Sequence, residues 1–115
     1  MKIVHLINSE GMFGAEYMVF NLLIALKKLG ADVIFGCLSP INSPGADLGR
    51  ELAKKQIPVV FINEHKKISL RGLLAIFRLL KGSHADLLHV HGYKATILGG
   101  IIAAIMNVPL ISASP

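Results

Sequence analysis

Apolar residues alternate along the chain between short continuous runs and longer stretches with helical spacing. The short runs are rich in Val, Ile, Leu and Phe and cover residues 2–8, 32–38, 58–62, 86–90 and 108–113. The longer stretches place apolar residues every three to four positions and cover residues 15–29, 47–56, 70–81 and 93–106. Short continuous apolar runs are typical of strands buried on both faces. The pattern therefore predicts five strands, with a helix after each of the first four.

The longer stretches also predict which helix faces point inward. The expected core stripe of residues 15–29 is Ala15, Met18, Val19, Leu22, Ala25, Leu26 and Leu29, and that of residues 70–81 is Leu70, Leu73, Leu74, Phe77 and Leu80. Gly30 and Gly82 are the expected ends of these helices, and Ser69 is the expected N-cap of the second. Residues 93–106 are apolar nearly all round, which predicts burial on several sides.

Alternating strands and helices predict an α/β fold with a Rossmann-like open parallel sheet and helices on both faces. We expect a single domain over residues 1–115 with the strand order 3-2-1-4-5. Ligands of such sheets bind beyond the carboxyl ends of the strands, where the strand order reverses. The expected site therefore lies between the first and fourth strands.

Composition narrows the class of protein. Hydrophobic residues make up 53% and charged residues 17% of the 115 positions, which excludes a disordered chain. Cys37 is the only cysteine, so no intrachain disulfide forms and a reducing cytoplasm is expected. Asn107 and Pro109 interrupt the apolar residues 95–111 before the ~20 positions that a membrane-spanning helix needs.

The net charge of +5 favours anionic partners. Five basic residues gather on or just before the third helix: Lys66, Lys67, Arg71, Arg78 and Lys81. They form either an ordinary solvated helix face or a surface for peripheral contact with an anionic membrane. Nucleic acid is not expected as a partner, because aromatic residues are only 6% of the chain and show no stacking pattern beside the basic residues.

The loop after the first strand is a candidate anion site. Gly11 and Gly14 allow close approach of a ligand to the backbone, and the following helix, which begins near Ala15 and Glu16, directs its amides toward it. The alternative is a tight turn without a ligand. A dinucleotide site is not expected, because the loop lacks the motif Gly-x-Gly-x-x-Gly and the second strand lacks an acidic residue at its end. A nucleotide triphosphatase P-loop is excluded, because no Gly-Lys-Ser or Gly-Lys-Thr follows the loop.

The end of the fourth strand carries two histidines, His89 and His91, on the same strand face. A metal site is not expected, because His5, His65 and His84 fall in other elements and leave the pair without a third ligand. His5 and His89 are expected to be structural. His91 precedes Gly92 at the carboxyl end of the strand, where a ligand contact is expected. No nucleophile–base arrangement or carboxylate pair identifies catalytic residues.

These segments together resemble a known family. The series Lys-Ile-Val-His-Leu, Gly-Met-Phe-Gly-Ala-Glu, Leu-Lys-Lys-Leu-Gly-Ala-Asp-Val, Asp-Leu-Leu-His-Val-His-Gly and Val-Pro-Leu-Ile-Ser is similar to the amino-terminal domain of GT-B glycosyltransferases, and within that fold to family 4. The resemblance covers the whole chain. It implies a retaining enzyme that transfers a hexose from a nucleotide-sugar to a cell-envelope polysaccharide or glycolipid.

The resemblance also implies roles for residues. Gly11, Gly14, Ala15 and Glu16 would border the donor diphosphate, and His91, Gly92 and Tyr93 would face the acceptor side. Two positions depart from the family. Phe13 replaces the first glycine of Gly-Gly-x-Glu, and Pro115 stands where the family commonly has a histidine.

The family's second Rossmann-like domain, which holds the nucleotide, is not in this sequence, so the resemblance implies an amino-terminal fragment that is inactive alone. Its expected partners are a nucleotide-sugar and a saccharide or lipid-linked acceptor, without cofactor or metal. Its expected place is the cytoplasm, with peripheral contact at the inner face of the plasma membrane. The residues leave one alternative open, which is a stand-alone flavodoxin-like module that binds a phosphorylated small molecule.

Overall fold

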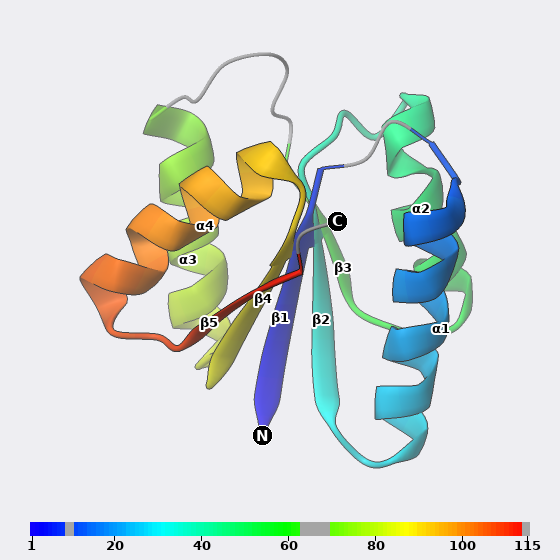
Figure 1. Cartoon of the computed structure of the whole chain (residues 1–115), viewed down its shortest axis with the longest axis horizontal. Helices are drawn as coiled ribbons and strands as arrows, with labels where there is room; N and C mark the ends of the chain where they lie inside the picture. Colours follow the sequence, from blue (N-terminus) through cyan, green and yellow to red (C-terminus); the bar gives the residue numbers. More distant parts are fainter. Residues whose placement is uncertain (9–10, 63–69, 114–115) are drawn as a thin grey trace.

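The computed structural model describes residues 1–8, 11–62 and 70–113 as alternating strands and helices (Figure 1). The strands are β1 (Lys2–Ile7), β2 (Asp32–Cys37), β3 (Val59–Phe61), β4 (Leu87–His91) and β5 (Leu110–Ala113). The helices are α1 (Gly14–Lys28), α2 (Asp47–Lys54), α3 (Leu70–Ser83) and α4 (Tyr93–Met106), and a 3-10 turn, η1 (Pro44–Ala46), precedes α2. The predicted elements are thus confirmed, with ends that differ by a few residues.

The sheet is parallel throughout, in the order β3-β2-β1-β4-β5. This confirms the predicted Rossmann-like topology, and the strand order reverses between β1 and β4. The register pairs His5 with His89 and Ile7 with His91 across that boundary. The ends of β1 and β4 therefore lie side by side at the carboxyl edge of the sheet.

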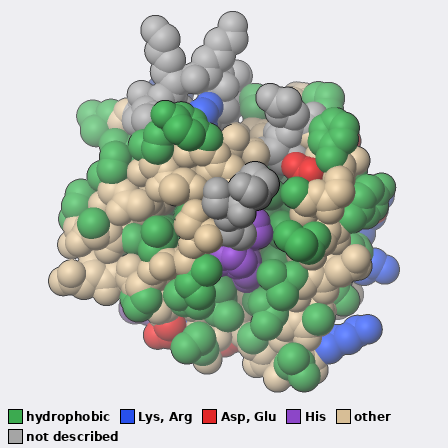
Figure 2. Space-filling view, in the orientation of Figure 1, with side chains coloured by type: hydrophobic (Ala, Val, Ile, Leu, Met, Phe, Trp, Pro, Cys, Tyr) green, Lys and Arg blue, Asp and Glu red, His purple; other side chains and the backbone are tan. Residues whose placement is uncertain are grey.

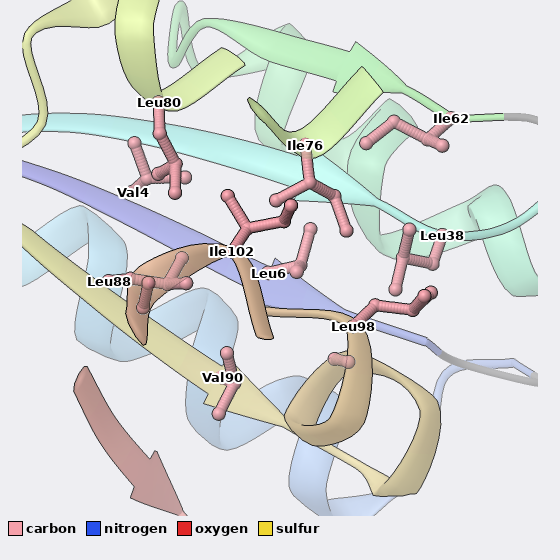
Figure 3. Packing of buried hydrophobic residues seen from close by; sticks show 12 residues of the cluster. Val4, Leu6, Leu38, Ile62, Ile76, Leu80, Leu88, Val90, Leu98 and Ile102 are labelled. Carbon is pink, nitrogen blue, oxygen red and sulfur yellow. The ribbon is translucent and has the colours of Figure 1, made fainter. Parts of the chain in front are cut away.

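Helices cover both faces of the sheet. Figure 1 shows α1 and α2 on one face and α3 and α4 on the other. The core on the α3–α4 face joins apolar side chains from β1, β4, α3 and α4 with the residues that follow β2 and β3. Figure 3 labels ten of them: Val4, Leu6, Leu38, Ile62, Ile76, Leu80, Leu88, Val90, Leu98 and Ile102. Helix α4 lies close to the strands at Gly99, where an added Cβ would come within 2.9 Å of Val90 Cγ1.

The predicted inward stripe of α1 is confirmed at Val19 and wrong at most of its other positions. The helix buries Glu16, Val19 and Leu23, whereas Met18 and Leu29 from the expected stripe are 59% and 84% exposed. Apolar residues occupy both faces of this helix, so spacing alone did not decide which one meets the sheet. The face that packs against the strands is the one that includes Leu23.

Helix α3 differs from its prediction in the same way. Gly72, Ile76 and Leu80 are buried, and Leu70 and Leu74 are exposed. The helix also passes Gly82 and ends at Ser83. His84 then adopts a left-handed φ of +53°, and the Ala85 N–H donates to the Leu80 carbonyl at 3.1 Å. Gly30 does follow α1 with φ +90°, as predicted, and Ser69 lies outside the described residues.

Helix α4 is buried on one side only. Ala95, Leu98 and Ile102 face the sheet, while Ile101 and Ile105 are exposed, contrary to the expected burial on several sides. The helix ends at Met106, and β5 begins at Leu110. Within the described part of the chain, no helix has both the length and the apolar character needed to cross a membrane.

Candidate functional site

The loops after β1 and β4 meet at the carboxyl edge of the sheet. Asn8 Oδ1 accepts a hydrogen bond from the Ala95 N–H at 3.0 Å, in the first turn of α4. Gly92, which precedes that helix, has φ +92° and ψ 161°, and an added Cβ would lie 2.6 Å from Asn8 Oδ1. Asn8 therefore supplies the cap that Gly92, without a side chain, does not.

Helix α1 begins at the same edge of the sheet, but its first turn is capped in a different way. Its N-cap, Phe13, has no side-chain oxygen, and the Glu16 carboxylate turns back to accept the Phe13 N–H at 3.1 Å. Gly14 is the first helical residue, and an added Cβ there would meet no atom within 4 Å. First-turn amides such as those of Gly14 and Ala15 have no acceptor within the helix. The start of α1 is consequently the more open of the two helix starts at this edge.

Exposed aromatic side chains lie in the first turns of both helices. Tyr93 at the start of α4 is 82% exposed, and Phe13 and Tyr17 at the start of α1 are 63% and 56% exposed. Large exposed rings provide flat apolar surface on which a sugar or a base can pack. Of the acceptor-side residues named from the sequence, Tyr93 is thus the accessible one, Gly92 is half-buried and His91 is 7% exposed.

Three histidines come together on the sheet face opposite α3 and α4. The ring centres of His5 and His89 are 5.1 Å apart, and those of His89 and His91 are 4.3 Å apart. The expectation that His5 lies apart from the other two is wrong, because the parallel register of β1 and β4 sets His5 directly beside His89. His89, which is expected to be structural, has a side chain that is only half-buried.

Burial lowers the pKa values of all three imidazoles. The pKa of His5 falls to about 3, first because of its burial and then because of the neighbouring His89 and His91. The pKa of His91 falls to about 4 through burial and the nearby His89, and burial also lowers the pKa of His89. The cluster is therefore neutral at pH 7.

A hollow of about 370 Å³ lies between α1 and α2. Its lining residues are Met12, Tyr17, Phe20, Asn21, Asp47, Arg50 and Glu51. Arg50 pairs with Asp47 and also donates to the Ser43 carbonyl. Sequence reasoning missed these lining residues. The Asp–Arg spacing of three on α2 was a usable signal for the pair, but only the packing of the two helices shows the hollow.

The structure describes three of the five basic residues predicted to lie on or just before the third helix. Arg71 and Arg78 are exposed on α3, beside the exposed Leu70 and Leu74. Lys81 lies over the Phe77 ring, with its Nζ 5.7 Å from the ring centre. Lys66 and Lys67, which belong to the same predicted surface, lie outside the described residues.

Comparison with known proteins gives one family match. The model of the family described as Glycosyltransferase Family 4 matches residues 13–113. MurG from Acinetobacter baumannii has a similar structure, with a TM-score of 0.77 at 15% identity over 98% of this chain and 34% of that one. HepE from Anabaena, solved in complex with UDP, gives a TM-score of 0.76 at 21% identity over 97% of this chain and 29% of that one.

The fold is shared more widely. The C-terminal domain of PF1911 hydrogenase from Pyrococcus furiosus gives a TM-score of 0.75 at 19% identity, over 96% of this chain and 88% of that one. At such identities the likeness shows the fold alone. The chain spans about a third of the length of the MurG and HepE structures. No curated protein matches the sequence significantly.

Proposed function

Because the chain belongs to glycosyltransferase family 4, we propose that it is the amino-terminal, acceptor-side domain of a retaining glycosyltransferase. The whole enzyme would transfer a hexose from a nucleotide-sugar to a cell-envelope polysaccharide or glycolipid. A second domain would hold the nucleotide, so residues 1–115 alone would not catalyse transfer. The observation that carries the proposal is the family match over residues 13–113, joined to an open helix start at the switch point of the sheet.

The start of α1 is the proposed contact for the donor diphosphate. Amides in the first turn of a helix carry partial positive charge and bind phosphate oxygens. The start of α4 is less suited, because Asn8 already accepts the Ala95 N–H. At α1, Gly14 leaves the approach unobstructed. Gly11, Ala15 and Glu16 complete the proposed set, with the Glu16 carboxylate holding the Phe13 amide and so shaping the loop.

This contact would act on the leaving group. Breaking the bond between the sugar and the diphosphate places negative charge on the phosphate oxygens. Fixed amides aimed at that charge stabilise it more in the transition state than in the bound donor. On the other side of the boundary between β1 and β4, His91, Gly92 and Tyr93 are the proposed acceptor-side residues, and the exposed Tyr93 ring offers a surface for a sugar.

The test is Gly14→Val in the protein made from its complete reading frame. An added Cβ at this first helical position meets no atom within 4 Å, and a valine side chain there would occupy the space in front of the amides. We expect transfer from nucleotide-sugars to fall at least about a hundred-fold, because one well-placed group of amide donors is worth that much in catalysis. The measurement is sugar transfer across a panel of UDP-, GDP- and ADP-sugars, together with thermal unfolding.

Gly82→Val is the matched control. An added Cβ at Gly82 also meets no atom within 4 Å, and this glycine lies near the far end of α3. The control is expected to keep its activity. Equal activity of the Gly14 and Gly82 variants would contradict the assigned diphosphate contact. Tight, saturable UDP binding by residues 1–115 alone would favour the flavodoxin-like binding module.

A peripheral position at the inner face of the plasma membrane is part of the same proposal. It is supported by Arg71 and Arg78, which are exposed next to Leu70 and Leu74 on α3. Basic residues beside exposed apolar ones are typical of helices that rest on anionic lipid. The acceptor of such an enzyme would be lipid-linked.

A further inference from the structure

The cluster of His5, His89 and His91 combines three imidazoles from two adjacent strands. One ligand atom from each residue lies within 4.8 Å of the others. Their arrangement follows from the sheet: the register places His5 beside His89, and two-residue alternation puts His91 on the same face. The backbone that carries the cluster is therefore central in the sheet and rigid.

The cluster holds polar atoms that are buried without partners. Among the described residues, neither Nδ1 nor Nε2 of His5 has a hydrogen-bond partner, and the same is true of His91 Nε2. The His5 side chain is 1% exposed and that of His91 is 7% exposed. Leaving a buried polar atom unpaired costs free energy, so such atoms in a native protein indicate a bound water or ion. An ion takes one nitrogen from each ring, so one nitrogen of His5 together with Nε2 of His91 points to a shared ligand.

The donor set selects the kind of ligand. Imidazole nitrogens bind Zn²⁺ and its neighbours among the divalent transition metals, whereas Mg²⁺ and Ca²⁺ prefer oxygen. Zinc bound at 2.0–2.1 Å needs its ligand atoms about 3.4 Å apart. The imidazoles would have to close by roughly 1.4 Å from the 4.8 Å limit. The half-buried His89 lies beside both other rings, and rotation of the three imidazoles about their side-chain torsions would supply that movement.

Among the described residues, the cluster reaches solvent through the half-buried His89. Helices α1 and α2 pack on β2 and β3, and α4 packs on the other face of β4 and β5. Figure 2 shows histidine side chains reaching the surface near the middle of this view, with hydrophobic side chains around them. On β5, Ile111 pairs with His89 in the register and is 50% exposed. An ion can therefore enter without unfolding of the sheet.

We propose that His5, His89 and His91 form a binding site for a zinc-class divalent transition-metal ion. Three protein ligands leave the fourth position of a tetrahedral ion for water or another oxygen ligand. This inference goes beyond glycosyl transfer and departs from the expectation, drawn from the sequence, that the chain binds no metal. It also stands apart from the proposed diphosphate contact, since none of the three histidines lies in α1, but it shares His91 with the proposed acceptor-side residues.

The test uses the 115-residue chain with ZnCl2 alone, measured by isothermal titration and by equilibrium dialysis with metal analysis. We expect one equivalent of zinc, with no binding of MgCl2 under the same conditions. His89→Gln is expected to weaken zinc binding at least about ten-fold, because even removing a residue that only supports a metal ligand costs that much. CoCl2 provides a spectroscopic check, since three imidazoles and water give the visible absorption of tetrahedral cobalt.

The control removes the histidines outside the cluster. His65→Asn/His84→Asn should still bind one equivalent, and asparagine suits the left-handed φ of His84. His5→Phe fills the buried position with an apolar ring and should abolish binding, with circular dichroism as the check on folding. Less than one equivalent in the unsubstituted chain, unchanged affinity in His89→Gln, or loss of binding in the control would each overturn the proposal. No nucleotide-sugar is present, so the result is independent of the transferase assay.

Discussion

Single residues set the geometry where the first and fourth strands end. Gly92 has a backbone conformation, φ +92° and ψ 161°, that is essentially confined to glycine. The space beside it is filled by Asn8, whose side chain caps α4. The motif His-x-His-Gly thus has a local structural reason for its glycine that is separate from any ligand.

Gly92→Ala is predicted to destabilise the chain by at least about 1–3 kcal/mol, the usual cost of such a backbone conformation for a residue with a Cβ. The new Cβ would also displace Asn8 and its hydrogen bond to Ala95. Urea unfolding at pH 7.5 measures the effect.

Asn8→Ala alone should cost about 1 kcal/mol, as loss of a helix cap does. The double variant Asn8→Ala/Gly92→Ala separates the cost of the clash with Asn8 from the cost of the strained backbone at residue 92. With the Asn8 side chain gone, the clash disappears but the strained φ of residue 92 remains. The double variant should therefore lose less than the sum of the single variants, and full additivity would contradict the contact.

The histidine cluster predicts a loss of stability in mild acid when metal is removed with EDTA. The pKa of His5 is about 3 in the folded chain, against about 6.5 for an unfolded histidine. Between these values the unfolded chain binds the extra proton, so stability is complete above pH 6.5 and falls as the pH drops toward 3. His5 alone should cost about 2 kcal/mol at pH 5 relative to pH 7.5.

Urea unfolding at the two pH values checks this. His5→Phe should lose less stability between pH 7.5 and 5 than the unsubstituted chain does. His84→Asn, at an exposed position outside the cluster, is the matched control. An equal pH dependence in all three chains would show that His5 titrates normally.

At the scale of elements, the sequence located the helices but not their buried faces. Helix α1 has apolar residues on two sides, and the side that includes Val19 and Leu23 packs on the sheet. Periodicity reports only that a stripe exists, and packing against neighbours decides its direction. The same reasoning applies to α3, where the misassigned Leu70 and Leu74 leave an apolar edge next to Arg71 and Arg78.

That edge of α3 predicts binding to vesicles with anionic lipid. Arg71→Ser/Arg78→Ser should weaken binding at least ten-fold, since each basic residue near such a surface contributes about 1 kcal/mol. Sedimentation with vesicles of phosphatidylglycerol and phosphatidylcholine measures it.

Lys28→Ser/Lys55→Ser makes the same change in charge at exposed positions away from α3 and serves as the control. It should bind as the unsubstituted chain does, apart from a small effect of net charge. Equal loss in both double variants would assign the binding to net charge and remove α3 as a membrane surface.

At the scale of the whole molecule, sequence patterns predicted the strand order, because alternating strands and helices with right-handed crossovers leave few topologies. They also placed the loop of Gly14 and the end of β4 at one edge. They could not predict that His5 meets His89, since this depends on the register of two strands 80 residues apart in sequence. The hollow between α1 and α2 was missed for a related reason: a gap between helices belongs to their packing and has no sequence motif.

The hydrogen bond from Ala95 to Asn8 joins residues 87 positions apart, and it bears on the order of folding. Helix α4 ends at a residue of its own segment, Asn107, which adopts a left-handed φ of 57°. Its first turn, by contrast, is capped by Asn8, the residue that follows β1. During synthesis Asn8 is made first and finds its partner only after another 87 residues have been added. Closure of this bond therefore waits for the synthesis of α4, and it joins the end of β1 to a helix that is made much later.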